Sequence, residues 1–236
     1  MRRALQRATL VVALGDEEKR AIRDGFLIDD AKVRVLPNGI APGFFDAAPA
    51  LFRERTGIAG AFVLMTGAIS PYKNQLGMAH ALAGLDLPFV VIGEAQERDR
   101  AYLARLREVR GVRWLGAMRH DDPLLASAYA AASVFVLPSQ GEVAPLSVME
   151  ALAAGTPVVM TADSALTLPD SGFALRKVRW TDGEGQQRAV SHFIAHPPPR
   201  DQVSRLVRGH TWDRVAAALA VHYREAAGAA EPRHAV

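Results

Sequence analysis

Short apolar runs recur along the chain, and the spacing between most of them leaves room for one helix. The runs carry apolar side chains at consecutive positions, which is typical of strands buried on both faces. We predict strands at residues 9–14, 32–38, 61–67, 88–94, 112–116, 133–139 and 157–162.

Helix-length segments lie between most of these strands. Residues 74–85 carry apolar residues at helical spacing, residues 97–109 form a charged amphipathic pattern, and residues 122–132 and 146–155 are two further candidates. Buried strands that alternate with helices predict an α/β fold with a doubly wound parallel sheet.

The regular alternation is confined to the middle of the chain. Residues 1–46 are interpreted as the remnant of an N-terminal domain followed by the turn-rich linker NGIAPGFFDAAPA, because they are too few to form a domain alone. Residues 47–200 are predicted to form one Rossmann-like domain, although the pattern does not order the elements of residues 163–200. Residues 201–226 are assigned to the C-terminal helix, which should run from Thr211, its N-cap, to about Ala226, and residues 227–236 to a frayed tail.

Composition narrows the class of protein. The 236 residues include no cysteine, which excludes disulfides and thiolate metal sites and leads us to expect a cytoplasmic protein. The formal net charge is only +3, and the one dense basic cluster, MRRALQR, is as typical of a solvated helix face as of a binding surface. We therefore expect no nucleic-acid partner. Membrane association stays open but unsupported, since no apolar run approaches the roughly 18 to 20 residues that span a bilayer.

Polar loops follow several of the predicted strands, and ligands of open α/β sheets bind at the carboxyl ends of strands. The loop TGAISPYKNQ begins near Gly67 and places Lys73 and Asn74 at the start of a helix. A lysine beside free helix amides favours a phosphate group, with a solvated surface lysine as the alternative. Gly93 and Gly116 end two other strands, in turns that are more often structural than ligand-binding.

The stretch SQGEVAPLSVMEALAAGTPVV contains two glutamates around the start of a predicted helix. Pro145 suits the first helical turn, so Glu142 should lie in the loop and Glu150 in the second turn. Both carboxylates can accept hydrogen bonds from sugar or ribose hydroxyls, and Lys73 can hold a phosphate, which together would suit a nucleotide sugar. For either glutamate alone, an ordinary loop carboxylate or an exposed helix residue is the commoner explanation.

Several segments, taken in chain order, carry a resemblance to a known family. They are PNGI (37–40), GAISPYKN (67–74), VIGEA (91–95), WLGAM (114–118) and SQGEVAPLSVMEALAAGTPVV (139–159). In this order they resemble the family 4 glycosyltransferases of GT-B fold, with Glu142 and Glu150 as the E-x7-E signature and Trp212 and Tyr223 in the last helix. The resemblance covers Ala8 to about Ala162. It implies the Rossmann-like C-terminal half of a GT-B fold and an enzyme that transfers a hexose-type sugar from a nucleotide-diphosphate donor to an unidentified acceptor with retention.

The resemblance also implies roles for single residues. Glu142 would bind hydroxyls of the transferred sugar at the reaction centre, Lys73 would contact the donor diphosphate there, and Glu150 would bind the ribose. The remaining donor contacts implied by the resemblance are Gly67 and Asn74 beside the lysine, the backbone of Ala144, Pro145, Leu146 and Ser147 along the diphosphate, and Gly93, Gly116 and Met118 around the base and ribose. No cofactor and no metal are implied, because the nucleotide sugar is the donor substrate.

Departures from the family pattern keep alternatives open. Ala68 stands where many relatives have an arginine, so one of two cations expected on the diphosphate is missing. Only the last strand and helix of the family's N-terminal domain are present, so a missing domain or a partner chain would supply the acceptor site. A non-catalytic or split-enzyme sugar-nucleotide-binding module is therefore the main alternative, and a nucleotide-sugar epimerase is less favoured. His192 and His196 have a spacing that can suit a metal, but no further ligand supports one.

Overall fold

The computed structural model describes residues 2–230, which divide into two compact units. The smaller unit joins residues 2–40 to residues 209–230, and the larger unit is Ala41–Arg208. The division between the two units falls between Ile40 and Ala41, and the C-terminal segment groups with the N-terminal one. Contacts explain this grouping: the Ile40 amide donates to the His210 carbonyl at 2.9 Å, and a Cβ added to Gly39 would lie 2.6 Å from Trp212.

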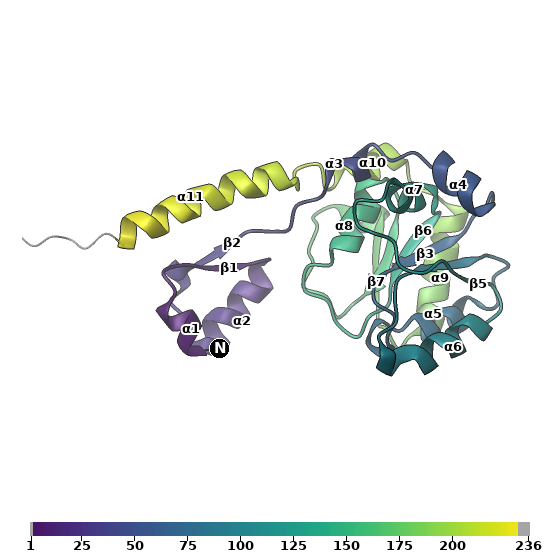
Figure 1. Ribbon diagram of the computed structural model, residues 1–236, viewed down its shortest axis with the longest axis horizontal. Helices are drawn as coiled ribbons and strands as arrows, with labels where there is room; N and C mark the ends of the chain where they lie inside the picture. Colours follow the sequence, from purple (N-terminus) through teal and green to yellow (C-terminus); the bar gives the residue numbers. More distant parts are fainter. Residues whose placement is uncertain (1, 231–236) are drawn as a thin grey trace, which may run out of the picture. The chain divides into compact units, whose positions relative to one another are not determined.

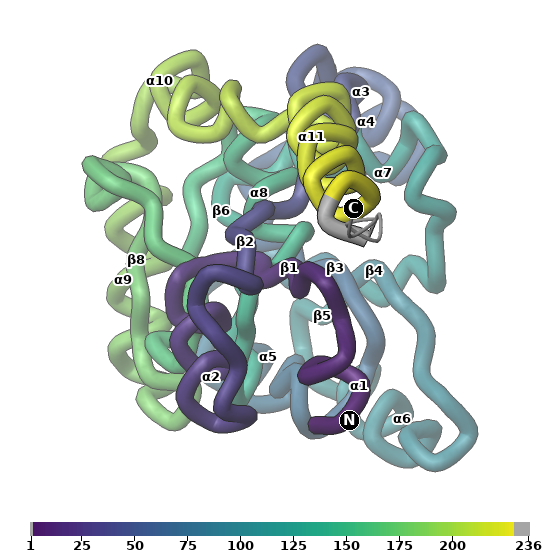
Figure 2. Tube along the Cα trace, turned by 90° about the vertical axis from the view of Figure 1, so that its left-hand side faces the viewer, coloured from purple at the N-terminus to yellow at the C-terminus, as the bar shows by residue number. Residues whose placement is uncertain are grey.

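The smaller unit contains a two-stranded parallel sheet with a connecting helix (Figure 2). β1 (Val11–Ala13) pairs with β2 (Val33–Val35), and α2 (Asp16–Phe26) lies between them in the chain. Apolar side chains from both strands and from Ile28 form its core. The strands predicted at 9–14 and 32–38 are therefore confirmed.

Two further helices belong to the smaller unit. α1 (Arg2–Arg7) contains the basic cluster, and its arginines are exposed, as in a solvated helix face. α11 (Trp212–Ala230) begins directly after Thr211, whose Oγ1 accepts a hydrogen bond from the Arg214 amide at 3.4 Å, so the predicted N-cap is confirmed. Residues 227–230 of the predicted tail are the last turn of α11, and residues 231–236 lie outside the described residues. Within the described part of the chain, no helix has both the length and the apolar character that crossing a bilayer requires.

The larger unit is built on a six-stranded parallel sheet in the order β5-β4-β3-β6-β7-β8 (Figure 1). Its strands are β3 (Val63–Thr66), β4 (Phe89–Ile92), β5 (Val112–Trp114), β6 (Val134–Leu137), β7 (Val158–Thr161) and β8 (Leu175–Val178). Every residue of β3, β4, β6 and β7 is buried, as the consecutive apolar positions indicate. The predicted doubly wound parallel sheet is confirmed.

Helices cover both faces of this sheet (Figure 1). One layer consists of α5 (Gln75–Leu82), α6 (Arg100–Glu108) and α9 (Gly183–Ala195). The other layer contains α7 (Pro123–Ala131) and α8 (Leu146–Ala153), with α3 (Pro42–Phe45), α4 (Ala50–Thr56) and α10 (Arg200–Arg205) packed against them. Single 3-10 turns occur at Asp30–Lys32, Pro71–Lys73, Glu97–Asp99 and Ser171–Phe173.

The segment after residue 163, which the sequence pattern leaves unordered, supplies the edge strand β8 and helix α9. The polar stretch TDGEGQQR is the start of α9 rather than a loop. Asp182 is its N-cap and accepts a hydrogen bond from the Gly185 amide at 2.8 Å. The glycines of this first turn have low helix propensity, which hides the helix from a pattern-based prediction.

Candidate functional site

The sheet has a switch point between β3 and β6, the central neighbours, because the chain proceeds outward from them in opposite directions. Loops after such strands diverge and leave a crevice at the carboxyl ends of the strands. A cavity of about 760 Å³ opens at this edge. Its lining residues are Thr66, Gly67 and Ala68 at and after the end of β3, residues 92–97 at and after the end of β4, Ala117, Met118 and His120 after β5, and Arg100, Leu125, Tyr129, Leu146, Ser147 and Glu150 from helices.

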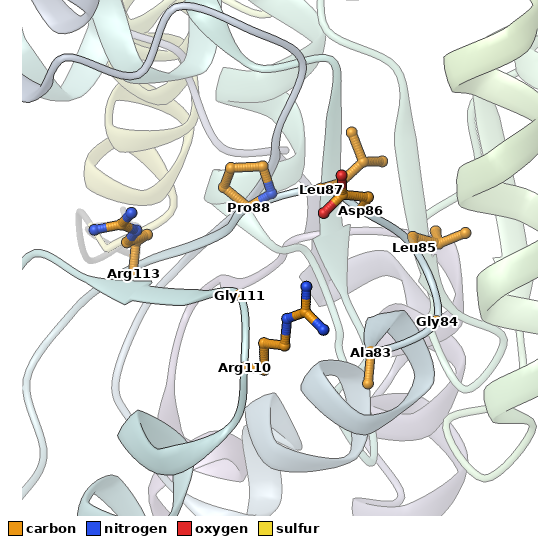
Figure 3. A pocket seen from close by; sticks show the side chains of 9 residues that line it. All are labelled: Ala83, Gly84, Leu85, Asp86, Leu87, Pro88, Arg110, Gly111 and Arg113. Atoms are coloured by element: carbon orange, nitrogen blue, oxygen red, sulfur yellow. The ribbon is translucent and has the colours of Figure 1, made fainter.

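Another hollow, of about 340 Å³, lies at the opposite edge of the sheet (Figure 3). Pro88 and Gly111, which directly precede β4 and β5, line it together with the exposed side chains of Asp86, Arg110 and Arg113. Ligands of doubly wound sheets bind at the carboxyl ends of strands, not at the amino ends, so the cavity at the switch point is the candidate site.

Glu150 is the buried acid of this cavity. It lies in the second turn of α8, as predicted, and is 5% exposed, so it is not a solvated helix residue. Its Oε2 accepts a hydrogen bond from the Tyr129 hydroxyl at 2.9 Å, and its Oε1 lies 2.7 Å from Nε2 of His120. A buried carboxylate persists only where donors satisfy it, and here they come from two other segments.

Tyr129 of α7 is fully buried beneath Glu150. Its hydroxyl also lies 2.6 Å from Oγ1 of Thr66, at the end of β3. Because the single tyrosine hydrogen is directed to the carboxylate, Thr66 donates to Tyr129. Burial, and then the negative charge of Glu150, raise the pKa of Tyr129 well above its ordinary value, so the phenol remains a donor.

His120 reaches Glu150 from the loop that precedes α7. Its ring lies 5.4 Å from that of Phe44, and 58% of its side chain is exposed. Neither His120 nor Tyr129 was among the residues predicted from the sequence. The segment WLGAMRHDD does contain His120, but nothing in its spacing distinguishes that residue from its polar neighbours.

Lys73 and Glu142, the two predicted catalytic residues, are brought together by the fold. Nζ of Lys73 lies 2.5 Å from Oε1 of Glu142, and both side chains are partly buried. Their loops are joined as well, since the Gln140 amide donates to the Tyr72 carbonyl at 2.9 Å and the Tyr72 hydroxyl to the Gly141 carbonyl at 2.7 Å. The pair does not belong to the lining of the large cavity.

The first turn of α8 borders the cavity. Pro145 is the N-cap, and the helix begins at Leu146. The Val148 and Met149 amides bond back to the Pro145 carbonyl, whereas the amides of Leu146 and Ser147 belong to the first turn, which has no acceptor within the helix. Both of these residues line the cavity, so this wall suits an anion.

The glycines of the site allow the backbones of neighbouring strand ends to approach one another closely. A Cβ on Gly93 would lie 1.8 Å from the carbonyl oxygen of Gly67, so the ends of β4 and β3 can meet only without a side chain there. Gly116 has φ +77°, in the left-handed region that favours glycine, and its carbonyl accepts from the Gly93 amide at 2.8 Å. Gly67 and Gly93 thus line the cavity, whereas Gly116 supports the Gly93 backbone from outside the lining.

The predicted donor contacts divide into two groups. Gly67, Gly93, Met118, Leu146, Ser147 and Glu150 line the cavity, whereas Lys73, Asn74, Gly116, Glu142, Ala144 and Pro145 do not. The Asn74 side chain donates instead to the Trp180 carbonyl at 3.1 Å, while its backbone takes a left-handed turn (φ 58°) into α5.

Cations near the cavity differ from the predicted pattern. Ala68 lines the cavity where the family pattern has an arginine, and Arg100, from the start of α6, lines it too. Arg100 is paired with Glu97 at 2.8 Å, and both side chains are exposed. Of the two histidines whose spacing could suit a metal, His192 and His196, the first has Nε2 3.2 Å from the guanidinium of Arg176.

Solved structures of glycosyltransferases share this fold. A glycosyltransferase from Rickettsia africae matches with a TM-score of 0.82 and 15% identity, over 95% of this chain and 66% of that chain. Sucrose-phosphate synthase from Thermosynechococcus elongatus matches with a TM-score of 0.82 and 20% identity, over 97% and 61%. Anabaena HepE, solved in complex with UDP, matches with a TM-score of 0.79 and 20% identity, over 94% and 65%. The chain has the α/β fold of GT-B glycosyltransferases.

The sequence comparisons assign the domain. Residues 60–175 match the family described as Glycosyl transferases group 1. The D-inositol 3-phosphate glycosyltransferase of Kineococcus radiotolerans is 34% identical over 180 residues, which cover 69% of this chain and 41% of that protein. The UDP-Gal:alpha-D-GlcNAc-diphosphoundecaprenol alpha-1,3-galactosyltransferase of Escherichia coli is 29% identical over 170 residues, which cover 65% and 42%. The chain therefore carries a group 1 glycosyltransferase domain and spans less than half the length of either relative.

Proposed function

We propose that this chain is the donor-binding half of a retaining glycosyltransferase, which transfers a hexose-type sugar from a nucleoside-diphosphate donor to an acceptor. The central observation is Glu150, a buried carboxylate held by two hydrogen-bond donors in the wall of the cavity at the switch point. A carboxylate so placed accepts hydrogen bonds from ribose hydroxyls.

The donor diphosphate lies along the start of α8 in this proposal. The first-turn amides of Leu146 and Ser147 and the positive end of the helix dipole stabilise its charge. Lys73 adds a cation, exchanging part of its contact with Glu142 for a phosphate oxygen. Because Ala68 supplies no second cation, the helix amides carry more of this charge than in relatives with an arginine.

Transfer begins when the bond between the sugar and the diphosphate breaks. Negative charge then grows on the leaving phosphate, where Lys73 and the α8 amides already stand, so the transition state gains more stabilisation than the bound donor. Glu142, paired with Lys73 in the neighbouring loop, binds hydroxyls of the transferred sugar. The base and ribose occupy the cavity behind Gly93 and Met118.

Relatives support the donor class. The Escherichia coli relative is named for a UDP-galactose donor, and the structurally similar HepE was solved with UDP.

A calorimetric panel tests the proposed function. UDP, GDP, ADP and their glucose conjugates are titrated into the purified protein. We expect at least one nucleoside diphosphate to bind with a measurable dissociation constant, and its sugar conjugate to bind as well. An absence of binding by every member of the panel would contradict the donor site.

A further inference from the structure

We infer that His120 is a positioning residue of the proposed donor site: with Tyr129 it orients Glu150 so that each carboxylate oxygen keeps one acceptor position for a ribose hydroxyl. This inference rests on the proposed function, and it assigns to His120 a part in selecting ribose over deoxyribose.

The two carboxylate oxygens of Glu150 can accept more hydrogen bonds than Tyr129 and His120 donate to them. An ionised carboxylate has about four lone-pair positions on its two oxygens. Tyr129 occupies one on Oε2 at 2.9 Å, and His120 occupies one on Oε1 at 2.7 Å. One position remains on each oxygen, and the two neighbouring hydroxyls of a ribose supply one donor for each.

His120 bonds to Glu150 and not to the adjacent Asp121 or Asp122, because both aspartates have other hydrogen-bond donors. Asp121 accepts two hydrogen bonds from Arg119, at 2.9 and 2.8 Å, and Asp122 accepts one from the Leu124 amide at 2.8 Å. Both acids of its own loop are therefore engaged. Nε2 must carry the hydrogen, because an ionised carboxylate only accepts.

The position of His120 also predicts how its removal would change the affinity for a ligand. The ring is supported on one side by Phe44, and the residue lines the same cavity as Glu150. Without it, the carboxylate is fixed by Tyr129 at Oε2 alone, and Oε1 can turn away from the direction that a second hydroxyl needs. Binding should then lose the worth of about one hydrogen bond to a charged group, a factor of roughly 10.

The test compares two ligands on two variants by calorimetry. The ligands are the nucleoside diphosphate that the wild type binds best among UDP, GDP and ADP, and its 2′,3′-dideoxy form. We expect His120→Ala to weaken binding of the ribonucleotide roughly 10-fold and to leave the affinity for the dideoxy form nearly unchanged. His120→Gln, whose amide can donate at the place of Nε2, should recover most of the affinity.

The outcomes separate the two claims. His196→Ala, at an exposed histidine of the same unit, serves as the control and should change neither ligand. An equal loss for both ligands, an unchanged ribonucleotide affinity, or no recovery by glutamine would overturn the role of His120 while the donor site stands. No binding of any nucleotide to the wild type would overturn the proposed function and, with it, this inference.

Discussion

Tyr129 is the centre of a hydrogen-bonded chain that runs from the end of β3 to α8. Thr66 donates to its hydroxyl, which donates to Glu150, and the ring itself packs against Phe44 and Phe135. Because the pKa of Tyr129 is raised, the folded protein keeps this phenol protonated at pH values where an unfolded chain would release its proton.

The pH dependence of stability follows from this shift. A group whose pKa is higher in the folded state contributes stability below its unfolded pKa, about 10 for tyrosine, and this contribution is lost as pH rises toward the folded value. We expect Tyr129→Phe to be less stable than wild type at pH 7, with a difference that narrows above about pH 10 by at most about 1.4 kcal/mol per pH unit. Urea unfolding across this range measures it.

The matched control is Tyr72→Phe, because Tyr72 lies in the same unit and is 51% exposed, whereas Tyr129 is fully buried. The narrowing of the stability difference above about pH 10 should be larger for Tyr129→Phe than any change that this control shows. A Tyr129→Phe difference that stays constant would contradict the assignment of Tyr129 as the protonated donor.

Side-chain environments limit what the sequence predicts at this scale. The position of Glu150 in the second turn of a helix follows from Pro145 and the apolar pattern, and that prediction is confirmed. Its burial does not follow, because its partners Tyr129 and His120 lie 21 and 30 residues away in the chain. Contacts between residues so far apart leave no local periodicity, and a single sequence therefore does not indicate them.

Elements meet at the site through their backbones as well as their side chains. Gly67 and Gly93 close the ends of the neighbouring strands β3 and β4, and the Gly67 amide bonds to the Ile92 carbonyl at 3.0 Å. The sequence places Gly93 at the end of a strand, and the structure shows that the end of the neighbouring strand β3 approaches it closely there.

A methyl group at Gly93 tests this packing. Gly93→Ala would place Cβ 1.8 Å from the Gly67 carbonyl oxygen, which belongs to the backbone and cannot swing aside. We expect a loss of about 1–3 kcal/mol in the free energy of unfolding, measured by urea titration. Gly60→Ala, which meets nothing within 4 Å, should stay within about 0.5 kcal/mol of wild type. Equal stability of the two variants would show that the strand ends separate freely.

Strand and helix order is the part of the fold that the sequence predicts best. Buried parallel strands carry consecutive apolar residues, so β3, β4, β6 and β7 can be recognised in the sequence. The edge strand β8 carries Arg176 and Lys177 at its two central positions, so it lacks an apolar run, and the sequence does not predict it. Both of these side chains are exposed, and exposure removes the signal that burial gives.

At the scale of the whole molecule, the chain combines a unit built on a six-stranded parallel sheet with a smaller unit that contains a two-stranded sheet. The smaller unit gathers both ends of the described chain, which a linear assignment of domains does not anticipate. The segments of the two ends meet through hydrogen bonds and packing around Ile40 and Trp212, contacts that only the folded structure reveals.

The two glutamates are proposed to bind different parts of the donor, and this assignment connects the single residues with the function of the whole chain. Glu150 lines the cavity and is predicted to hold the ribose, whereas Glu142 pairs with Lys73 outside that lining and is predicted to hold the sugar. The two carboxylates should therefore affect different ligands.

Calorimetry of a nucleoside diphosphate and its sugar conjugate with Glu150→Ala and Glu142→Ala tests this claim most directly. We expect Glu150→Ala to weaken both ligands by a similar factor of roughly 10 to 100, the worth of hydrogen bonds to a charged group. Glu142→Ala should leave the plain nucleotide nearly unchanged and weaken only the sugar conjugate. Equal losses of plain nucleotide affinity in the two variants would contradict the account.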